Sequence, residues 1–252
     1  MELLGGISGF LAICILVLGC LLGIVFYRLG CHLPGVMKYQ DLVAVEEITG
    51  SKVEKPNLPP VLSAPYSGLK GIVLESASML FTGLATMLAF NAGGWEFNIQ
   101  TLLLLLLVWM MILSSVVDFE DMLLPDNCIS VICWAGMLYS ALGFGISPYE
   151  AVLGAIVSYL CVSVFINLYE KVRNIEAMGR GDFKLIAALM TWIGLGETMN
   201  FLLISTLSFL TFNVVIRVAQ SNKEPHQPFG PFLCLSCFVI VFTDLDMTRL
   251  LP

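Results

Sequence analysis

Residues 101–118, TLLLLLLVWMMILSSVVD, form an apolar run that ends in an aspartate. A helix needs about 20 mostly apolar residues to cross a bilayer, so residues 99–117 are predicted to form a membrane span. Hydrophobic residues make up 58% of the chain and charged residues only 12%, well below the roughly 25% charged residues of a soluble domain. The sequence therefore predicts an all-α, polytopic membrane protein.

Seven further apolar runs extend this prediction to a bundle of about eight transmembrane helices. The first run could be a cleaved signal peptide, but it lacks a basic start and a small-residue cleavage site, so we expect a retained helix. Residues 1–27 would then be the first span, 28–71 a short cytosolic loop domain, and 72–252 the membrane-embedded domain. The predicted spans are 6–27, 72–92, 99–117, 127–145, 149–169, 185–196, 199–219 and 229–244.

The basic residues support this topology, because lysine and arginine are retained on the cytosolic side of a membrane. If the N-terminus lies outside, eleven of the twelve basic residues face the cytosol and only Arg249 does not. The net charge of −7 argues against a nucleic-acid partner, which would require a basic surface. The eleven are Arg28, Lys38, Lys52, Lys55, Lys70, Lys171, Arg173, Arg180, Lys184, Arg217 and Lys223.

The cysteines are interpreted as small apolar residues of the helix bundle. Seven of the eight lie inside predicted spans, and only Cys31 lies at a membrane edge. The pair Cys234 and Cys237 has the spacing of half a zinc site, but it has no second pair, and the chain contains two histidines. No metal site is predicted.

Two aspartates at the cytosolic edge of the membrane carry the functional prediction. Asp118 ends one apolar run, where partial desolvation favours a protonated carboxyl. Asp182 lies in MGRGDFKL, residues 178–185, where the glycines let a substrate backbone approach closely, although an aspartate there also suits helix capping. Two close carboxylates share one proton and supply a base and an acid together, which is sufficient to hydrolyse a peptide bond.

Chemistry alone does not settle the partner of Asp182, because the segment DFEDMLLPDN also contains Glu120, Asp121 and Asp126. Asp126 follows Pro125 and opens the next span, which suits an N-cap, and Glu120 and Asp121 lie further from the hydrocarbon. Position therefore favours Asp118. The sequence contains no nucleophile elbow, zinc-protease motif or P-loop, so an aspartyl pair is the remaining catalytic arrangement.

Four stretches resemble the type IV prepilin peptidase family. VVDFEDMLLPD (116–126) and MGRGDFKL (178–185) are similar to its paired aspartate motifs, GCLLGIVFYRLGCHLP (19–34) to its N-terminal signature, and PFGPFL (228–233) to an element before its last span. The resemblance implies catalytic roles for Asp118 and Asp182, whose relative roles as acid and base stay open. The supporting motif residues would be Pro125, Asp126, Gly179, Gly181 and Lys184.

The resemblance also implies an activity and its partners. Family members in bacteria remove the basic leader of prepilin or pseudopilin substrates at the cytosolic face of the inner membrane, for pilus assembly or protein secretion. They then methylate the new N-terminus with S-adenosylmethionine. Many have two Cys-x-x-Cys pairs in the first loop, which this chain lacks, so its loop resembles a shortened variant without zinc. The candidate region for methylation includes Lys70, Gly71 and Glu75.

The alternative prediction is a polytopic transporter in which membrane-edge acids guide a proton or cation. Against it, no predicted span has an acid near its middle, where transporters usually place their binding sites. A structural component of a secretion machine is a third alternative, and it would not require both aspartates. No oligomeric state is predicted.

Overall fold

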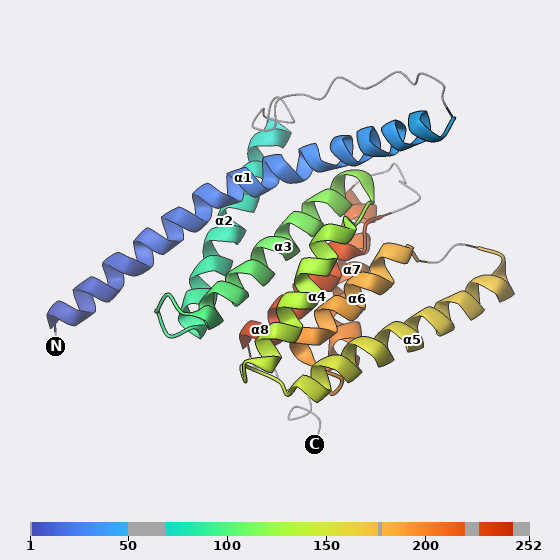
Figure 1. Ribbon diagram of the computed structural model, residues 1–252. Helices are drawn as coiled ribbons and strands as arrows, with labels where there is room; N and C mark the ends of the chain where they lie inside the picture. The colour runs from blue at the N-terminus through green and yellow to red at the C-terminus, as the bar shows by residue number, and fades with distance from the viewer. Residues whose placement is uncertain (1, 50–68, 176–177, 220–226, 244–252) are drawn as a thin grey trace. The chain divides into compact units, whose positions relative to one another are not determined.

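The computed structural model describes residues 2–49, 69–175, 178–219 and 227–243. These residues form eight helices and no strand, which confirms the all-α prediction, and each helix overlaps one of the predicted apolar runs (Figure 1). The helices are α1 (Glu2–Thr49), α2 (Leu69–Ala92), α3 (Ile99–Asp121), α4 (Asp126–Ala141), α5 (Pro148–Arg173), α6 (Arg180–Ile193), α7 (Thr198–Ala219) and α8 (Gly230–Thr243).

The chain divides into two compact units, Met1–Leu88 and Ala89–Pro252. In the first unit, α1 and α2 cross closely at glycines. A Cβ atom added to Gly19 would lie 2.9 Å from the Cα of Gly83, and one added to Gly23 would lie 2.7 Å from the Cα of Met79. The hydroxyl of Ser78 donates to the carbonyl of Gly23 at 3.2 Å. Small residues therefore let the two backbones approach each other.

Helix α1 continues further than the sequence predicted. The predicted span ended at residue 27, whereas the helix runs to Thr49 and has Pro34 inside it. Proline removes one backbone hydrogen bond from a helix, but residues 35–49 contain no further proline and only one glycine, Gly35, so the helix resumes after it. Residues 50–68, the rest of the predicted loop, lie outside the described part of the chain.

The second unit is built around two short helices, α6 and α8. Helix α6 packs against α4, α5 and α8, and α8 packs also against α3 and α7, while α3 packs against α4. Helix α6 is buried at ten positions between Asp182 and Ile193. The indole N–H of Trp192 in α6 donates to the carbonyl of Ile132 in α4 at 2.9 Å. Helix α8 begins at the buried residue Gly230, whereas α6 begins at the exposed Arg180 and is mostly buried from Asp182 onward.

The peripheral helix α5 contacts the bundle through small residues. Its buried residues are Ala151, Gly154, Ala155 and Ser158, and a Cβ atom added to Gly154 would lie 3.1 Å from the backbone of Gly194. Local signals fix its start, because Pro148 occupies the first turn and the Ser147 hydroxyl accepts the N–H of Glu150. The C-terminal half of α5 is mostly exposed, as suits a surface that faces lipid.

Helix length separates the predicted spans into two groups. Within the described residues, four stretches are long and apolar enough to cross a membrane: Leu11–Gln40, Ile99–Asp121, Pro148–Arg173 and Thr198–Val218. Helices α6 and α8 have 14 residues each, or roughly 21 Å at 1.5 Å per residue, less than the hydrocarbon thickness of about 30 Å. Protein covers ten of the 14 residues of α6 and seven of the 14 residues of α8.

The prediction that the cysteines are core residues is right for some and wrong for others. Cys128, Cys234 and Cys237 are buried, whereas Cys14 and Cys161 are exposed on α1 and α5. The difference depends on the side of the helix on which each thiol lies. A helix that is apolar on all sides has no sequence pattern that distinguishes the side facing protein from the side facing lipid.

Candidate active site

Asp118 lies in the last turn of α3, and its residue surface is 5% exposed. The helix ends at Met122, which adopts a left-handed conformation and donates its N–H to the carbonyl of Asp118 at 3.0 Å. One turn earlier, Ser114 is also buried. The side of α3 that faces the bundle therefore becomes polar as the helix ends.

The other acidic residues of this segment differ from Asp118 in burial. Glu120 is partly exposed, and Asp121 and Asp126 are exposed. Asp126 is the first residue of α4 rather than its N-cap, a position that Pro125 takes without a side-chain hydrogen bond. The prediction that Asp126 caps the helix is therefore wrong.

Asp182 is the third residue of α6 and is 9% exposed. The N-cap is Gly179, so the capping position anticipated for Asp182 is wrong by three residues. From its position in the first turn, the carboxylate instead accepts the backbone N–H of Gly179, as an acidic residue does in a capping box. A Cβ atom added to Gly179 would lie 3.2 Å from Oδ2 of Asp182.

The two buried aspartates act on each other electrostatically. Burial raises the pKa of Asp182 to about 7, the charge of Asp118 adds to the rise, and the N–H of Gly179 opposes it. Like charges in a desolvated site disfavour ionisation of both groups. The structure thus brings together the two aspartates that the sequence singled out, and it gives Asp182 a proton near neutral pH.

A third segment reaches the same site. The backbone N–H of Gly230, the first residue of α8, donates to Oδ2 of Asp118 at 2.9 Å. The thiol of Cys234, one turn further along α8, is buried beside the hydroxyl of Ser115 and interacts electrostatically with both aspartates. Gly230 and Cys234 were not among the predicted site residues, although Gly230 lies within PFGPFL, one of the four stretches that resemble the family.

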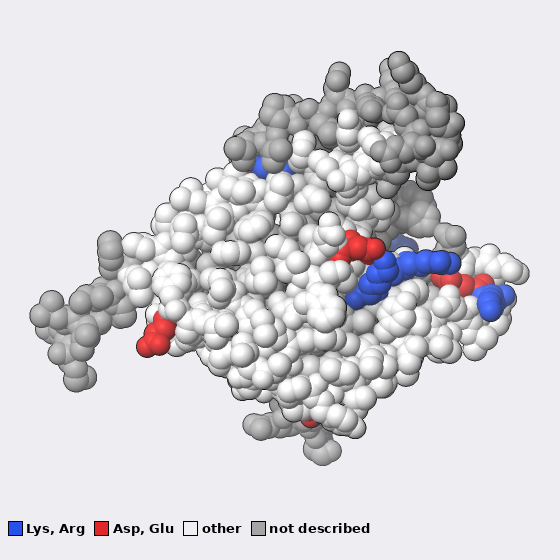
Figure 2. All heavy atoms as spheres, viewed as in Figure 1, with Lys and Arg blue, Asp and Glu red and all other residues white. Residues whose placement is uncertain are grey.

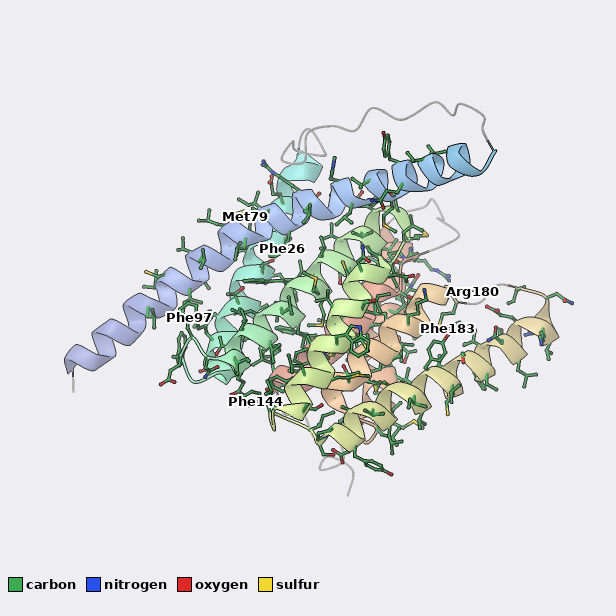
Figure 3. All side chains as sticks on the ribbon, viewed as in Figure 1. Phe26, Met79, Phe97, Phe144, Arg180 and Phe183 are labelled. Carbon is green, nitrogen blue, oxygen red and sulfur yellow. The ribbon has the colours of Figure 1, made fainter. Side chains whose placement is uncertain are left out.

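Leu124 packs between the starts of α6 and α8. A Cβ atom added to Gly181 would lie 3.0 Å from the Cβ of Leu124, and one added to Gly230 would lie 3.3 Å from its Cδ2. The α3–α4 connection is therefore held against both helices whose N-termini meet the aspartates. Figure 3 shows the start of α6, marked by Arg180 and Phe183.

The supporting motif residues Asp126 and Lys184 form an ion pair. The Nζ of Lys184 donates to both carboxylate oxygens of Asp126 at 2.8 Å. The side chain of Asp126 is 68% exposed and that of Lys184 is 48% exposed, so the pair lies at the surface. It links the start of α4 to the first turns of α6.

The residues predicted for methylation lie in the first unit. Lys70 and Gly71 belong to the first turn of α2, and their side chains are outside the described part of the structure. Glu75 is partly buried, and its Oε1 accepts from Nε of Arg28 at 2.8 Å. This ion pair joins Arg28, which lies within the N-terminal signature of residues 19–34, to the first part of α2.

The fold and the site together define a class, a helical membrane protein with two interacting aspartates buried at helix ends. Comparison with known proteins narrows that class. Residues 105–214 match the Type IV leader peptidase family, and this range includes the two aspartate motifs, VVDFEDMLLPD and MGRGDFKL, on which the resemblance was based. The matched segment includes α4, α5 and α6, most of α3 and α7, and both aspartates.

Several relatives carry the name prepilin leader peptidase/N-methyltransferase. The protein from Aeromonas hydrophila is 32% identical over 188 residues, covering 74% of this chain and 62% of the relative. The protein from Legionella pneumophila is 33% identical over 162 residues, covering 63% of this chain and 56% of the relative. The chain thus spans less than two thirds of the length of these curated relatives. No solved structure matches the chain.

Proposed function

We propose that this protein is a prepilin leader peptidase in which Asp118 and Asp182 form the catalytic pair. The observation that carries the proposal is the meeting of these two buried aspartates, from the end of α3 and the start of α6, with an electrostatic interaction between them. The family match over residues 105–214 and the names of the relatives support the same activity.

The aspartate pair provides the chemistry of hydrolysis without a covalent intermediate. The ionised carboxylate takes a proton from a water molecule, whose oxygen attacks the carbonyl carbon of the scissile bond. The protonated carboxyl donates a hydrogen bond to the carbonyl oxygen and stabilises the charge that develops there. The carboxyl that took a proton from water then passes it to the leaving amine as the C–N bond breaks. The pair ends with one proton, as it began.

The proposed substrate is a prepilin or pseudopilin with a basic leader followed by an apolar helix. Such a helix can lie in the bilayer while the scissile bond stands at the membrane edge, level with Asp118 and Asp182. On the visible face of the second unit, basic side chains gather where α5 ends and α6 begins (Figure 2). This distribution supports an active site at the cytosolic face of the inner membrane.

N-methylation is the second proposed activity, and the names of the relatives support it. S-adenosylmethionine would supply the methyl group from a positively charged sulfonium. In the described part of the candidate region, the Glu75 carboxylate pairs with Nε of Arg28 at 2.8 Å. This ion pair fixes the position of Glu75 and balances its charge, so we assign no residue to binding of the methyl donor.

The first prediction tests the catalytic pair. Purified protein is mixed with a prepilin and labelled S-adenosylmethionine, and leader removal and methyl incorporation are followed separately. Asp118→Asn and Asp182→Asn should each lower the cleavage rate by at least about 100-fold, because each removes one proton-transfer group. Both variants should still methylate a substrate from which the leader has already been removed.

The control is Asp121→Asn, which removes an exposed carboxylate from the same segment and should cleave at a rate close to that of the unmodified protein. Near-normal cleavage by either Asp118→Asn or Asp182→Asn would remove that aspartate from the pair. Absence of methylation in the unmodified protein would limit the function to cleavage.

A further inference from the structure

We infer that Gly230 is a positioning residue of the active site, and this inference rests on the proposed function. Its backbone N–H holds the Asp118 carboxylate from the N-terminus of α8, and its missing side chain leaves the space that this carboxylate occupies. The hydrogen bond from Gly230 N to Asp118 Oδ2 is 2.9 Å long, buried, and joins residues 112 positions apart in the chain.

The geometry of α8 leaves this N–H available. The first residues of a helix have no intrahelical acceptor for their N–H groups. The second residue of α8 is Pro231, which has no N–H, and the N–H of the third, Phe232, donates to the carbonyl of Phe229 at 3.0 Å. Of these three residues, only Gly230 donates its N–H to a side chain, and the acceptor is the carboxylate of Asp118. The positive end of the α8 dipole adds to the attraction for a carboxylate.

The space beside Gly230 is as important as its N–H. A Cβ atom added there would lie 2.7 Å from Oδ2 of Asp118, closer than real Cβ atoms approach other atoms, and 3.1 Å from its Cγ, which is a tight contact. The φ angle of Gly230 is not in the left-handed region, so the glycine is not required by backbone conformation. What excludes a side chain at this position is the Asp118 carboxylate.

Aromatic packing fixes the start of α8. The ring of Phe229 packs edge to face on Phe209 of α7, with centroids 5.3 Å apart. On the other side of Gly230, the ring of Phe232 packs on Phe209 and Phe212 at 5.4 and 5.2 Å. The ring of Phe212 also meets Phe119, the neighbour of Asp118, at 6.3 Å. The residues on both sides of the N–H donor are therefore anchored, so the donor has a defined position relative to the end of α3.

The kinetic test compares Gly230→Ala with Gly196→Ala, a control at which an added Cβ atom meets nothing within 4 Å. For Gly230→Ala, kcat for leader cleavage should fall about 100-fold, the order expected when a catalytic group is misplaced by about 1 Å. KM should change less than about twofold, because the substrate contacts elsewhere persist. Gly196→Ala should keep both constants.

A double variant separates displacement of the carboxylate from crowding of Leu124, which lies 3.3 Å from the same added Cβ atom. If Gly230→Ala acts on Asp118, combining it with Leu124→Ala leaves kcat low. Recovery of kcat in the double variant would overturn the inference, as would a Gly230→Ala variant with near-normal kcat. If the unmodified protein and Gly196→Ala do not cleave a prepilin, the proposed function itself fails.

A second measurement does not depend on catalysis or on the folding of a Gly230 variant. Labelling phenylalanine with ¹³C at the carbonyl and glycine with ¹⁵N selects two sites in the chain, Phe144–Gly145 and Phe229–Gly230. In Asp118→Ala, the Gly230 amide should exchange with solvent at least about tenfold faster, because its acceptor is gone. Gly145 should not change. Equal exchange at Gly230 in both proteins would overturn the inference.

Discussion

The protonation of Asp182 is decided by opposing local effects. Its position in the first turn of α6 and the N–H of Gly179 favour the ionised carboxylate, whereas burial and the Asp118 charge favour the protonated form and prevail. Glycine at position 179 is part of this balance, because a side chain there would approach Oδ2 of Asp182. The residue thus retains a proton at a pH at which most aspartates have lost theirs.

This balance predicts a pH dependence for cleavage. In the proposed mechanism the pair acts with one proton, and burial, with the Asp118 charge, raises the pKa of Asp182 to about 7. As the pH rises through about 7, the shared proton is lost and two carboxylates remain, so kcat should fall about tenfold for each pH unit above the transition. The measurement is the initial rate of leader removal between pH 5 and pH 9.

Each sample should also be tested for recovery after return to pH 6.5, which separates titration from denaturation. Because the two carboxyls are coupled, the observed transition belongs to the pair. A cleavage rate that stays constant up to pH 9 would show that the reaction does not depend on a carboxyl proton held near neutral pH.

At the scale of elements, the site is a meeting of helix ends. The C-terminus of α3 supplies Asp118, the N-terminus of α6 supplies Asp182, and the N-terminus of α8 supplies the Gly230 N–H. The α3–α4 connection crosses this meeting point through Leu124, and its far end is tied to α6 by the ion pair of Asp126 and Lys184. We therefore interpret this pair as a link that maintains the spacing of α3 and α6.

The ion pair gives a prediction for paired substitutions. Asp126→Lys and Lys184→Asp alone should each lower kcat for cleavage roughly 3–10-fold, because each places two like charges together across the link. The double variant, which restores opposite charges, should recover most of the loss. A double-mutant cycle on kcat measures this coupling.

The free energy of unfolding should change by less than about 1 kcal/mol in the neutralised variant Lys184→Gln, because both partners are largely exposed. Additive losses in the two charge-reversed variants, with no recovery on combining them, would show that the pair does not link the two helices.

Helix identity could be predicted from the sequence, but several helix ends could not. Each apolar run became a helix because a bilayer requires internally satisfied backbone hydrogen bonds. The predicted end of α6 at residue 196 was three residues late, because Gly194 takes a φ of +80 and stops the helix at Ile193. The predicted end of α4 at residue 145 was late for a similar reason, since Gly143 and Gly145 both have positive φ.

At the scale of the whole molecule, sequence motifs pointed to two parts of the candidate site and missed the third. Asp118 and Asp182 were each marked by local context, an apolar run or flanking glycines. The role of Gly230 depends on a contact across 112 residues, and no local pattern states which carboxylate a helix N-terminus will meet. The same holds for the pairing of Asp126 with Lys184, which are 58 residues apart.

The orientation of the whole molecule yields the last prediction. In a variant whose eight cysteines are replaced, single cysteines are introduced as Lys171→Cys, at the end of α5, and Glu197→Cys, in the turn between α6 and α7. A membrane-impermeant maleimide added to spheroplasts should label Glu197→Cys and not Lys171→Cys, because the basic end of the bundle faces the cytosol. Both should react after permeabilisation. Labelling of Lys171→Cys in intact spheroplasts would place the Asp182 end of α6 outside the cell, away from a basic leader that is retained in the cytosol, and would contradict leader cleavage at that face.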